Sequence, residues 1–530
     1  MLTNLIIWSI IFFHLLGVGR LVIHLFADKE SQLKVSVPIL LFIGLFTAMG
    51  ILSITHFFIP VSIISFSLLS FLACIGYFLS VKTMHLELGL SSITQRLFLF
   101  GVGVLILFQS SQTPTWVDTR LYHNQVVQWY SHYPIVKGLA NLFFAYGYNS
   151  FFHLYASQYT FGFLPVLYSQ SAAVSFLFLL FAYYIIQSIS EKNSSPIVLL
   201  LICLVVFRDR ISSTTPDGLI YILIAVGVLE FVKSSKQRES HVFLILSFFM
   251  IPMVKLSGVV YALLIIPYVL QRHQHKLNFL FVIGVVMGCV WVARNLVLSG
   301  YPLMPLSVGS FPFKHTIPYD ILKQGVLEIK YFQRLPLDNW RDAIGVPFPY
   351  WVPKWYSLHE RIDKSLMLLT PTCLLVLVLC VRRFSTKQKI AFGMVILAVL
   401  FWVFLSPGMR FVYMYIALLL MWVYQIFEKY VYHKLPVFKL SVGVVMLLLC
   451  YFLLQKASFN QLLRPAEIAK ATIAKKRTKE GLLYTYPIEG RCRGASIPCG
   501  YLYPYKEIHS FTHKPEDGFY SVFFGYEYVK

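Results

Sequence analysis

An aspartate, Asp118, stands in a polar segment that follows a long apolar block of the sequence. The segment is Pro114-Thr-Trp-Val-Asp-Thr-Arg-Leu-Tyr-His123, so Arg120 and His123 lie within five positions of the carboxylate. A carboxylate that is shielded from bulk water can act as a general base on an acceptor hydroxyl. Aspartate is also a favoured N-cap of helices, and the spacing alone leaves both roles open.

A second aspartate, Asp217, belongs to the polar turn Ser-Ser-Thr-Thr-Pro-Asp-Gly at 212–218, between two short apolar segments. The preceding residues Arg208, Asp209 and Arg210 make this a charged turn, although a simple hairpin needs no charge. Ionisable groups at membrane depth are costly, so they are candidates for function. The alternative is that Asp217 caps the helix that begins near 217.

Three cations, Lys255, Arg294 and Arg410, each lie in or beside an apolar segment. Arginine suits phosphate because its planar guanidinium donates two hydrogen bonds at once. The three residues together could therefore bind a phosphate or pyrophosphate head group. Each one taken singly could instead extend towards ordinary lipid head groups or pair with a structural carboxylate.

Several other signals are missing from the sequence. It contains neither a phosphate-binding Gly-rich loop of the P-loop type nor a zinc-type His/Cys cluster, which argues against a nucleotide-driven transporter or a kinase. Asp118 has no acidic residue two positions away, which argues against a metal-bridged nucleotide sugar. We therefore predict no cofactor and no set of metal-ligating residues. A role for a divalent metal in the reaction stays open.

The eight cysteines fall into two groups. Six lie in apolar blocks, where a free thiol behaves as a small hydrophobic side chain, whereas Cys492 and Cys499 lie together in the polar C-terminal part. That pair could form a small disulfide loop, which requires an oxidising compartment, or remain as two free thiols. We favour the disulfide.

The elements that must position these residues are membrane helices. Of the 530 residues, 58% are hydrophobic and 13% charged, against about 25% charged residues in an ordinary soluble domain. The mean hydropathy is +0.69, and the apolar residues form blocks that approach the length of a membrane span. We expect an all-α integral membrane protein with about 11–14 membrane helices. The expected segments are 5–26, 36–56, 60–80, 97–110, 166–188, 196–207, 217–232, 242–252, 256–270, 277–297, 366–381, 390–405, 411–427 and 440–455.

Basic residues in the short loops predict the orientation. If 111–165 is external, the inside loops hold seventeen Lys and Arg, whereas the short outside turns hold four, as the positive-inside rule requires. The net charge of +22 lies mostly in such turns, in the larger loops and in the tail, so we expect membrane lipid as a partner and no nucleic acid. The predicted parts are N-terminal membrane helices 1–110, an external loop with interfacial helices 111–165, membrane helices 166–297, an external loop 298–365, membrane helices 366–455 and a small external C-terminal tail 456–530.

A family resemblance rests on several short motifs. They are Asp118-Thr-Arg-Leu-Tyr-His123, Val136-Lys-Gly-Leu-Ala-Asn141, Gly147-Tyr-Asn-Ser150, Ser212-Ser-Thr-Thr-Pro-Asp217, Lys255-Leu-Ser257, Arg294-Asn-Leu-Val-Leu-Ser-Gly-Tyr-Pro302, Ser406-Pro-Gly-Met-Arg-Phe411 and the Cys492 to Cys499 tail. In this order they resemble an uncharacterised family of bacterial polytopic membrane proteins from surface-polysaccharide loci. The sequence departs from that pattern at Arg120, where a small residue is expected, and at Lys137, where proline is expected.

That family is similar in layout to the GT-C glycosyltransferases, which take a sugar from a polyprenyl-phosphate donor. The resemblance implies that Asp118 is the catalytic base and that Lys255, Arg294 or Arg410 binds the donor phosphate. His123 and Asp217 would then orient the acceptor.

The resulting hypothesis is a glycosyltransferase in the bacterial inner (cytoplasmic) membrane, with its catalytic loops on the periplasmic side. It would move a sugar from a polyprenyl-phosphate-linked donor to a glycan or a lipid-linked acceptor. Two alternatives remain: an O-antigen-type polymerase or ligase, and a flippase or other transporter of lipid-linked oligosaccharides.

Overall fold

A computed structural model describes most of the chain. The described residues are 1–26, 33–81, 84–161, 166–190, 193–233, 237–270, 278–335, 340–431, 472–488, 492, 495–500 and 506–523. The expected segment 440–455 lies outside them.

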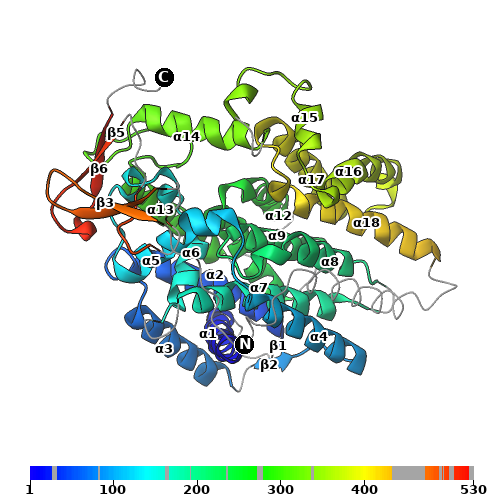
Figure 1. Ribbon diagram of the computed structural model, residues 1–530. Helices are drawn as coiled ribbons and strands as arrows, with labels where there is room; N and C mark the ends of the chain where they lie inside the picture. Colours follow the sequence, from blue (N-terminus) through cyan, green and yellow to red (C-terminus); the bar gives the residue numbers. More distant parts are fainter. Residues whose placement is uncertain are drawn as a thin grey trace.

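The described residues are mostly helical, with a few short strands (Figure 1). The helices up to residue 233 are α1 Leu2–Phe26, α2 Val37–Thr55, α3 Ile63–Ser80, α4 Ile93–Ser110, α5 Asn124–His132, α6 Phe151–Gln158, α7 Val166–Ser188, α8 Ile197–Val206 and α9 Pro216–Lys233. The later helices are α10 Arg238–Val254, α11 Val259–Ala262, α12 Ile265–Leu270, α13 Asn278–Ser299, α14 Tyr319–Phe332, α15 Val352–Ser357, α16 Arg361–Cys380, α17 Thr386–Leu405 and α18 Tyr413–Val431. The strands are β1 Leu33–Ser36, β2 Met84–Glu87, β3 Ile473–Arg477, β4 Leu483–Pro487, β5 Lys506–Ser510 and β6 Phe519–Phe523.

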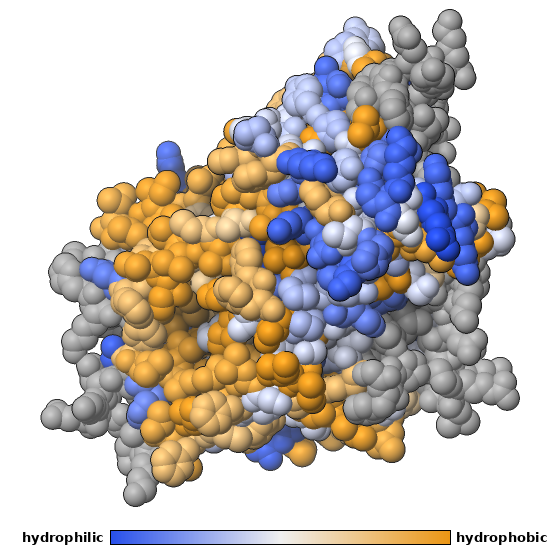
Figure 2. All heavy atoms as spheres, turned by 90° about the vertical axis from the view of Figure 1, so that its left-hand side faces the viewer, coloured by the Kyte–Doolittle hydropathy of each residue, from blue (hydrophilic) through white to orange (hydrophobic). Residues whose placement is uncertain are grey.

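Eight helices in the described part of the chain are long and apolar enough to cross a membrane. Two of them, α2 and α7, are largely buried inside the bundle, whereas α3, α4, α13, α16 and α17 leave most of their surface uncovered. The uncovered side chains are large and apolar, for example Phe71, Phe78 and Phe401. Figure 2 shows how such side chains form a broad apolar surface, with polar residues gathered at its upper right. This is the architecture of a multi-pass membrane protein.

The first three helices pack through glycines. A Cβ at Gly44 of α2 would meet the backbone of Leu15 in α1, and one at Gly76 of α3 would meet the backbone of Gly17. Small residues let membrane helices approach closely enough for van der Waals contact along their backbones. The loops that follow α1 and α3 meet as well, because β1 and β2 pair in parallel.

Two expected helix pairs, 196–207 with 217–232 and 242–252 with 256–270, form α8 to α12. The helix α9 has 18 residues and α10 has 17, so each is about 25 Å long and nearly crosses a hydrocarbon core. The second pair is interrupted, because the backbone is extended at Lys255 and only short helical turns follow. The break puts Lys255 at a helix end.

The sequence predicts helices on the membrane surface in the 111–165 segment, but the structure buries one of its helices, α6, inside the bundle. Every side chain of α6 is buried, and α6 packs against α2, α5 and α7 inside the protein. The reason is composition, since Phe151, Phe152 and Leu154 belong to a helix that is apolar on most sides. This helix is therefore part of the bundle core.

The described parts of the tail form two antiparallel hairpins, β3 with β4 and β5 with β6. They lie at the upper left of Figure 1, next to α5. The Phe519 amide donates to the Lys137 carbonyl (2.9 Å), and the buried Lys506 ammonium donates to the Asn141 carbonyl (2.9 Å). The tail is therefore attached to the segment that follows Asp118.

Candidate functional site

The carboxylate of Asp217 lies at the centre of a group of cations. Lys255 Nζ contacts Asp217 Oδ1 directly, while Arg210 Nη1 is 3.6 Å and Arg410 Nη1 4.0 Å from Asp217 Oδ2. The Asp217 side chain is only 2% exposed and occupies the first turn of α9, where the helix dipole favours negative charge. The three cations neutralise a carboxylate that would otherwise be costly to bury.

Asp118 joins this group through Arg410. Arg410 Nη1 donates to Asp118 Oδ2 at 2.6 Å, and the Asp118 side chain is 20% exposed. Directly after Asp118 the chain forms a π-helical turn, η1 Thr119–His123, a rare geometry that is frequent at functional sites. Asp118 is thus the more accessible of the two carboxylates.

We call Asp118, Arg210, Asp217, Lys255 and Arg410 the charge cluster. Three cations face two carboxylates, which leaves one net positive charge at the cluster. Within the described residues, Arg410 Nε and Arg210 Nη1 are buried and have no hydrogen-bond acceptor. Buried guanidinium donors without acceptors cost free energy, so their orientation favours an anionic ligand at this place.

Aromatic rings close two sides of the cluster. The guanidinium of Arg210 lies 3.7 Å from the centre of the Trp116 ring, and Lys255 Nζ lies 4.6 Å from that of Phe411. Such rings attract cations and exclude water from them. A small pocket, lined in part by Asp217, Lys255 and Arg410, has a volume of about 10 Å³, room for about one water molecule or one phosphate oxygen.

His123 lies at the buried side of the cluster. Its ring is 1% exposed and lies 5.0 Å from the ring of His153, and neither of its nitrogens has a hydrogen-bond partner among the described residues. Burial, followed by the nearby Lys255 and Arg410, lowers the pKa of His123 to about 3 despite the opposing charge of Asp217. The imidazole is therefore neutral near pH 7, when it can accept or donate one hydrogen bond but brings no charge.

Arg294 stands apart from the cluster. It is fully buried in α13 and donates to Asn149 Oδ1 (3.0 Å), to His56 Nδ1 (3.0 Å) and to the Ser53 carbonyl (3.3 Å). These contacts join α2, α13 and the loop before α6. They support a structural role, and the predicted part in phosphate binding has no geometric support.

Other loops support the cations of the cluster. The turn that contains Arg410 is held by Trp355, whose indole donates to the Pro407 carbonyl at 3.1 Å. The end of α10 before Lys255 is held by Ser150, whose hydroxyl donates to the Val254 carbonyl at 2.6 Å. The 111–165 segment, through Ser150, and the 298–365 loop, through Trp355, therefore hold the parts of the chain that carry Lys255 and Arg410.

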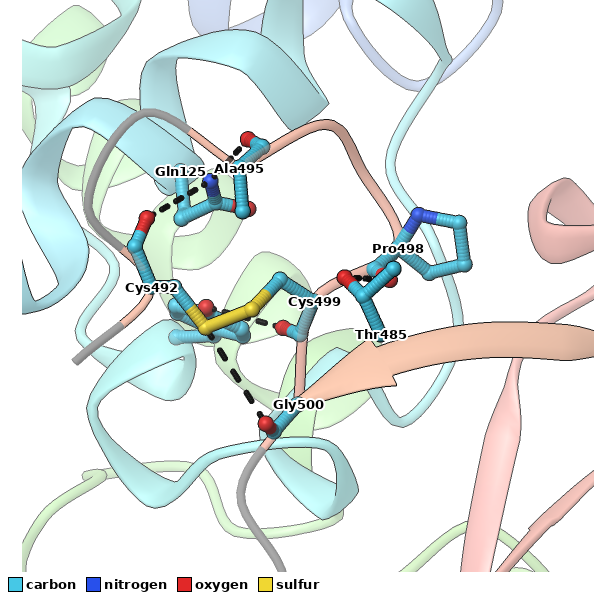
Figure 3. Close-up of a disulfide and its surroundings, with 8 residues drawn as sticks. Gln125, Thr485, Cys492, Ala495, Pro498, Cys499 and Gly500 are labelled. Atoms are coloured by element: carbon cyan, nitrogen blue, oxygen red, sulfur yellow. Dashed lines mark hydrogen bonds between the residues drawn. A yellow bond between two sulfur atoms is a disulfide. The ribbon is translucent and has the colours of Figure 1, made fainter. Parts of the chain in front are cut away.

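Cys492 and Cys499 form a disulfide, whose turn lies over α5 (Figure 3). Gln125 Nε2 donates to the Ala495 carbonyl at 2.7 Å and to the Cys492 carbonyl at 3.4 Å. Because Gln125 follows η1 by two residues, the disulfide-bonded turn fixes the helix that continues from Asp118.

Replacing Cys492 by serine is expected to loosen this turn. Loss of a disulfide across this short loop costs about 2 kcal/mol in the loop-entropy estimate. We expect amide exchange to accelerate by about tenfold or more at Thr485 and Gly500, which are hydrogen-bonded across the turn, and to stay unchanged in α2. The measurement is hydrogen exchange followed by mass spectrometry, with Cys203→Ser as a matched control. Unchanged exchange at Thr485 in the Cys492 variant would contradict this account.

The sequence predicts Asp118, Asp217, Lys255 and Arg410 on one face of the membrane, and the structure places them in one cluster. In the sequence, Arg210 stands out only as part of a charged turn, and nothing marks Trp116 as the aromatic partner of a cation. A signal was present, since Arg210 is a cation at a turn where basic residues are unusual. No group of three or more metal-binding side chains occurs among the residues that the structure describes.

A family model described as a domain of unknown function, DUF8201, matches residues 1–417. No curated protein and no solved structure matches the chain. The matched region contains the whole charge cluster, whereas the disulfide-bonded tail lies beyond it.

Proposed function

The chain belongs to the DUF8201 family, and we propose that its charge cluster is the active site of a membrane glycosyltransferase that uses a polyprenyl-phosphate-linked sugar. The observation that carries the proposal is the net positive cluster, in which the buried Arg410 Nε has no hydrogen-bond acceptor among the described residues, beside a partly exposed carboxylate.

The donor phosphate would place one oxygen in the small pocket beside Lys255 and Arg410. A phosphate that leaves a sugar gains negative charge on its bridging oxygen, and fixed cations in a site of low polarity stabilise that charge. Arg410 would bridge the two reacting partners, because it already binds Asp118 on one side and has a free Nε donor.

The acceptor hydroxyl would bind at Asp118. The reaction forms a bond between the acceptor oxygen and the anomeric carbon, and breaks the bond from that carbon to the phosphate oxygen. The bonding electron pair leaves with the lipid phosphate, and the acceptor proton passes to Asp118. Asp217 is held ionised by three cations, so it orients Lys255 and Arg210 and is a poor base. The neutral His123 can position the acceptor through a hydrogen bond.

The catalytic face is proposed to be periplasmic, because the loops of the opposite end carry the excess of Lys and Arg. The Cys492–Cys499 disulfide supports this side, since disulfides persist in oxidising compartments.

The test uses right-side-out and inverted membrane vesicles that contain the protein and a polyprenyl-phosphate donor with a labelled sugar. We expect labelled glycan or glycolipid when acceptor is supplied on the periplasmic side only. Translocation of intact donor without any transfer would overturn the proposal in favour of a flippase. Transfer of whole oligosaccharides from pyrophosphate donors, with no use of the monophosphate donor, would instead identify a polymerase or ligase.

A further inference from the structure

An apolar cavity of about 290 Å³ lies close to the charge cluster. Its polar lining is negligible. The lining side chains come from α10, the turn that follows it, α11, α12 and α13, and are Phe248, Phe249, Pro252, Met253, Leu256, Ala262, Ile265 and Trp291. No polar contact is available there for a sugar, so the cavity suits a hydrocarbon ligand.

The cavity and the small polar pocket share no lining residue, but the chain segment around Lys255 contributes side chains to both. Met253 and Leu256 line the apolar cavity, and Lys255, between them in the chain, lines the polar pocket with Asp217 and Arg410. This arrangement depends on the extended backbone at Lys255, which ends α10 and turns successive side chains to different sides. Apolar and cationic surroundings therefore lie only a few residues apart in the chain at this break.

The cavity also lies beside the lipid-facing surface. Val259, Leu263 and Ile266, on the same short helical turns that supply its wall, are exposed and apolar. A membrane lipid could therefore enter sideways without bringing its chain into water.

We propose that this cavity holds the first isoprenoid units of the polyprenyl chain, with the phosphate of the same molecule at Lys255 and Arg410. The inference rests on the proposed function and assigns the lipid part of its substrate. Charge complementarity supports a phosphate ligand, since the cluster carries one net positive charge and the buried Arg410 Nε has no hydrogen-bond acceptor among the described residues. The rest of a long chain would extend into the bilayer.

The test fills the cavity with larger side chains and varies the length of the polyprenyl chain. Ala262→Trp places a large ring in the cavity, whereas Leu263→Trp, at the next residue, points its ring at lipid, because Leu263 is 44% exposed and does not line the cavity. Binding of C55 and C10 polyprenyl phosphates to protein in nanodiscs is measured by native mass spectrometry, with phosphatidylglycerol as a competitor. Ile265→Trp is a second filling variant, and melting temperatures verify that each variant is folded.

In the wild type we expect both the C55 and the C10 lipid to bind, because the first isoprenoid units of either lipid occupy the cavity, and phosphatidylglycerol to compete poorly. Ala262→Trp and Ile265→Trp should weaken C55 binding by roughly tenfold or more, since the isoprenoid units lose the apolar surface that they bury in the cavity, and Leu263→Trp should leave it unchanged. Equal loss in all three variants, no loss in folded filling variants, or equal competition by phosphatidylglycerol would overturn the assignment. These outcomes concern binding alone. A protein that shows the expected binding but transfers no sugar would overturn the proposed function and leave the lipid site standing.

Discussion

Replacing Asp118 by asparagine is expected to lower the rate of sugar transfer by about 10²- to 10⁴-fold, the usual contribution of a general base. Asparagine keeps the shape of the side chain and can still accept a hydrogen bond from Arg410, but it cannot take the acceptor proton. Binding of polyprenyl phosphate should remain, because the cations of the cluster are intact. The measurement is the single-turnover rate with bound donor, which separates chemistry from binding.

Asp209→Asn is the matched control for this experiment. Asp209 is a carboxylate near the same site, but its side chain is 45% exposed and pairs only with Arg208 among the described residues. The control should transfer sugar at the wild-type rate. Transfer by Asp118→Asn at close to the wild-type rate, or an equal loss in both variants, would remove Asp118 from the mechanism.

Replacing Lys255 by methionine is expected to remove activity and to destabilise the protein. Loss of one partner from a buried ion pair costs about 3–5 kcal/mol, and we expect about 3 kcal/mol here because Arg210 and Arg410 still neutralise Asp217. The free energy of unfolding in detergent measures the loss of stability. Binding of polyprenyl phosphate, which the activity requires, is measured separately and should fall because one phosphate contact is lost.

A double variant distinguishes these two effects. Adding Asp217→Asn to Lys255→Met removes the uncompensated carboxylate, so stability should recover in large part while phosphate binding stays low. Lys233→Met is the matched control, because Lys233 is 59% exposed in its pair with Glu230 and should cost less than about 1 kcal/mol. Full recovery of phosphate binding in the double variant would show that Lys255 acts only on stability.

The membrane architecture could be predicted from the sequence, because apolar blocks and loop charges report directly on burial in lipid. The common face of Asp118, Asp217, Lys255 and Arg410 followed from topology, since helix ends on one side of a membrane lie at similar depth. Helix boundaries were less accurate at the charged starts of α16 and α17, which begin at Arg361 and Thr386 rather than at 366 and 390. Charged residues can continue a helix into the interface at little cost.

Tertiary pairing could not be predicted in the same way. Arg294 and Arg410 both border apolar segments, yet Arg294 donates to neutral acceptors within the bundle and Arg410 donates to Asp118. Which acceptor each cation meets depends on helix rotation and packing, which the sequence pattern does not encode. The contact of the tail with Gln125 has the same origin, since it joins residues 370 positions apart.

The most direct test of the central claim, that the charge cluster catalyses sugar transfer from a lipid phosphate, is product analysis with purified protein in liposomes. The liposomes contain a labelled polyprenyl-phosphate sugar and glycolipid acceptors extracted from cells that carry the gene. We predict equal amounts of free polyprenyl phosphate and of glycosylated acceptor from the wild type, with neither product from Asp118→Asn. Intact donor after incubation with folded, donor-binding wild-type protein and its acceptors would contradict the account.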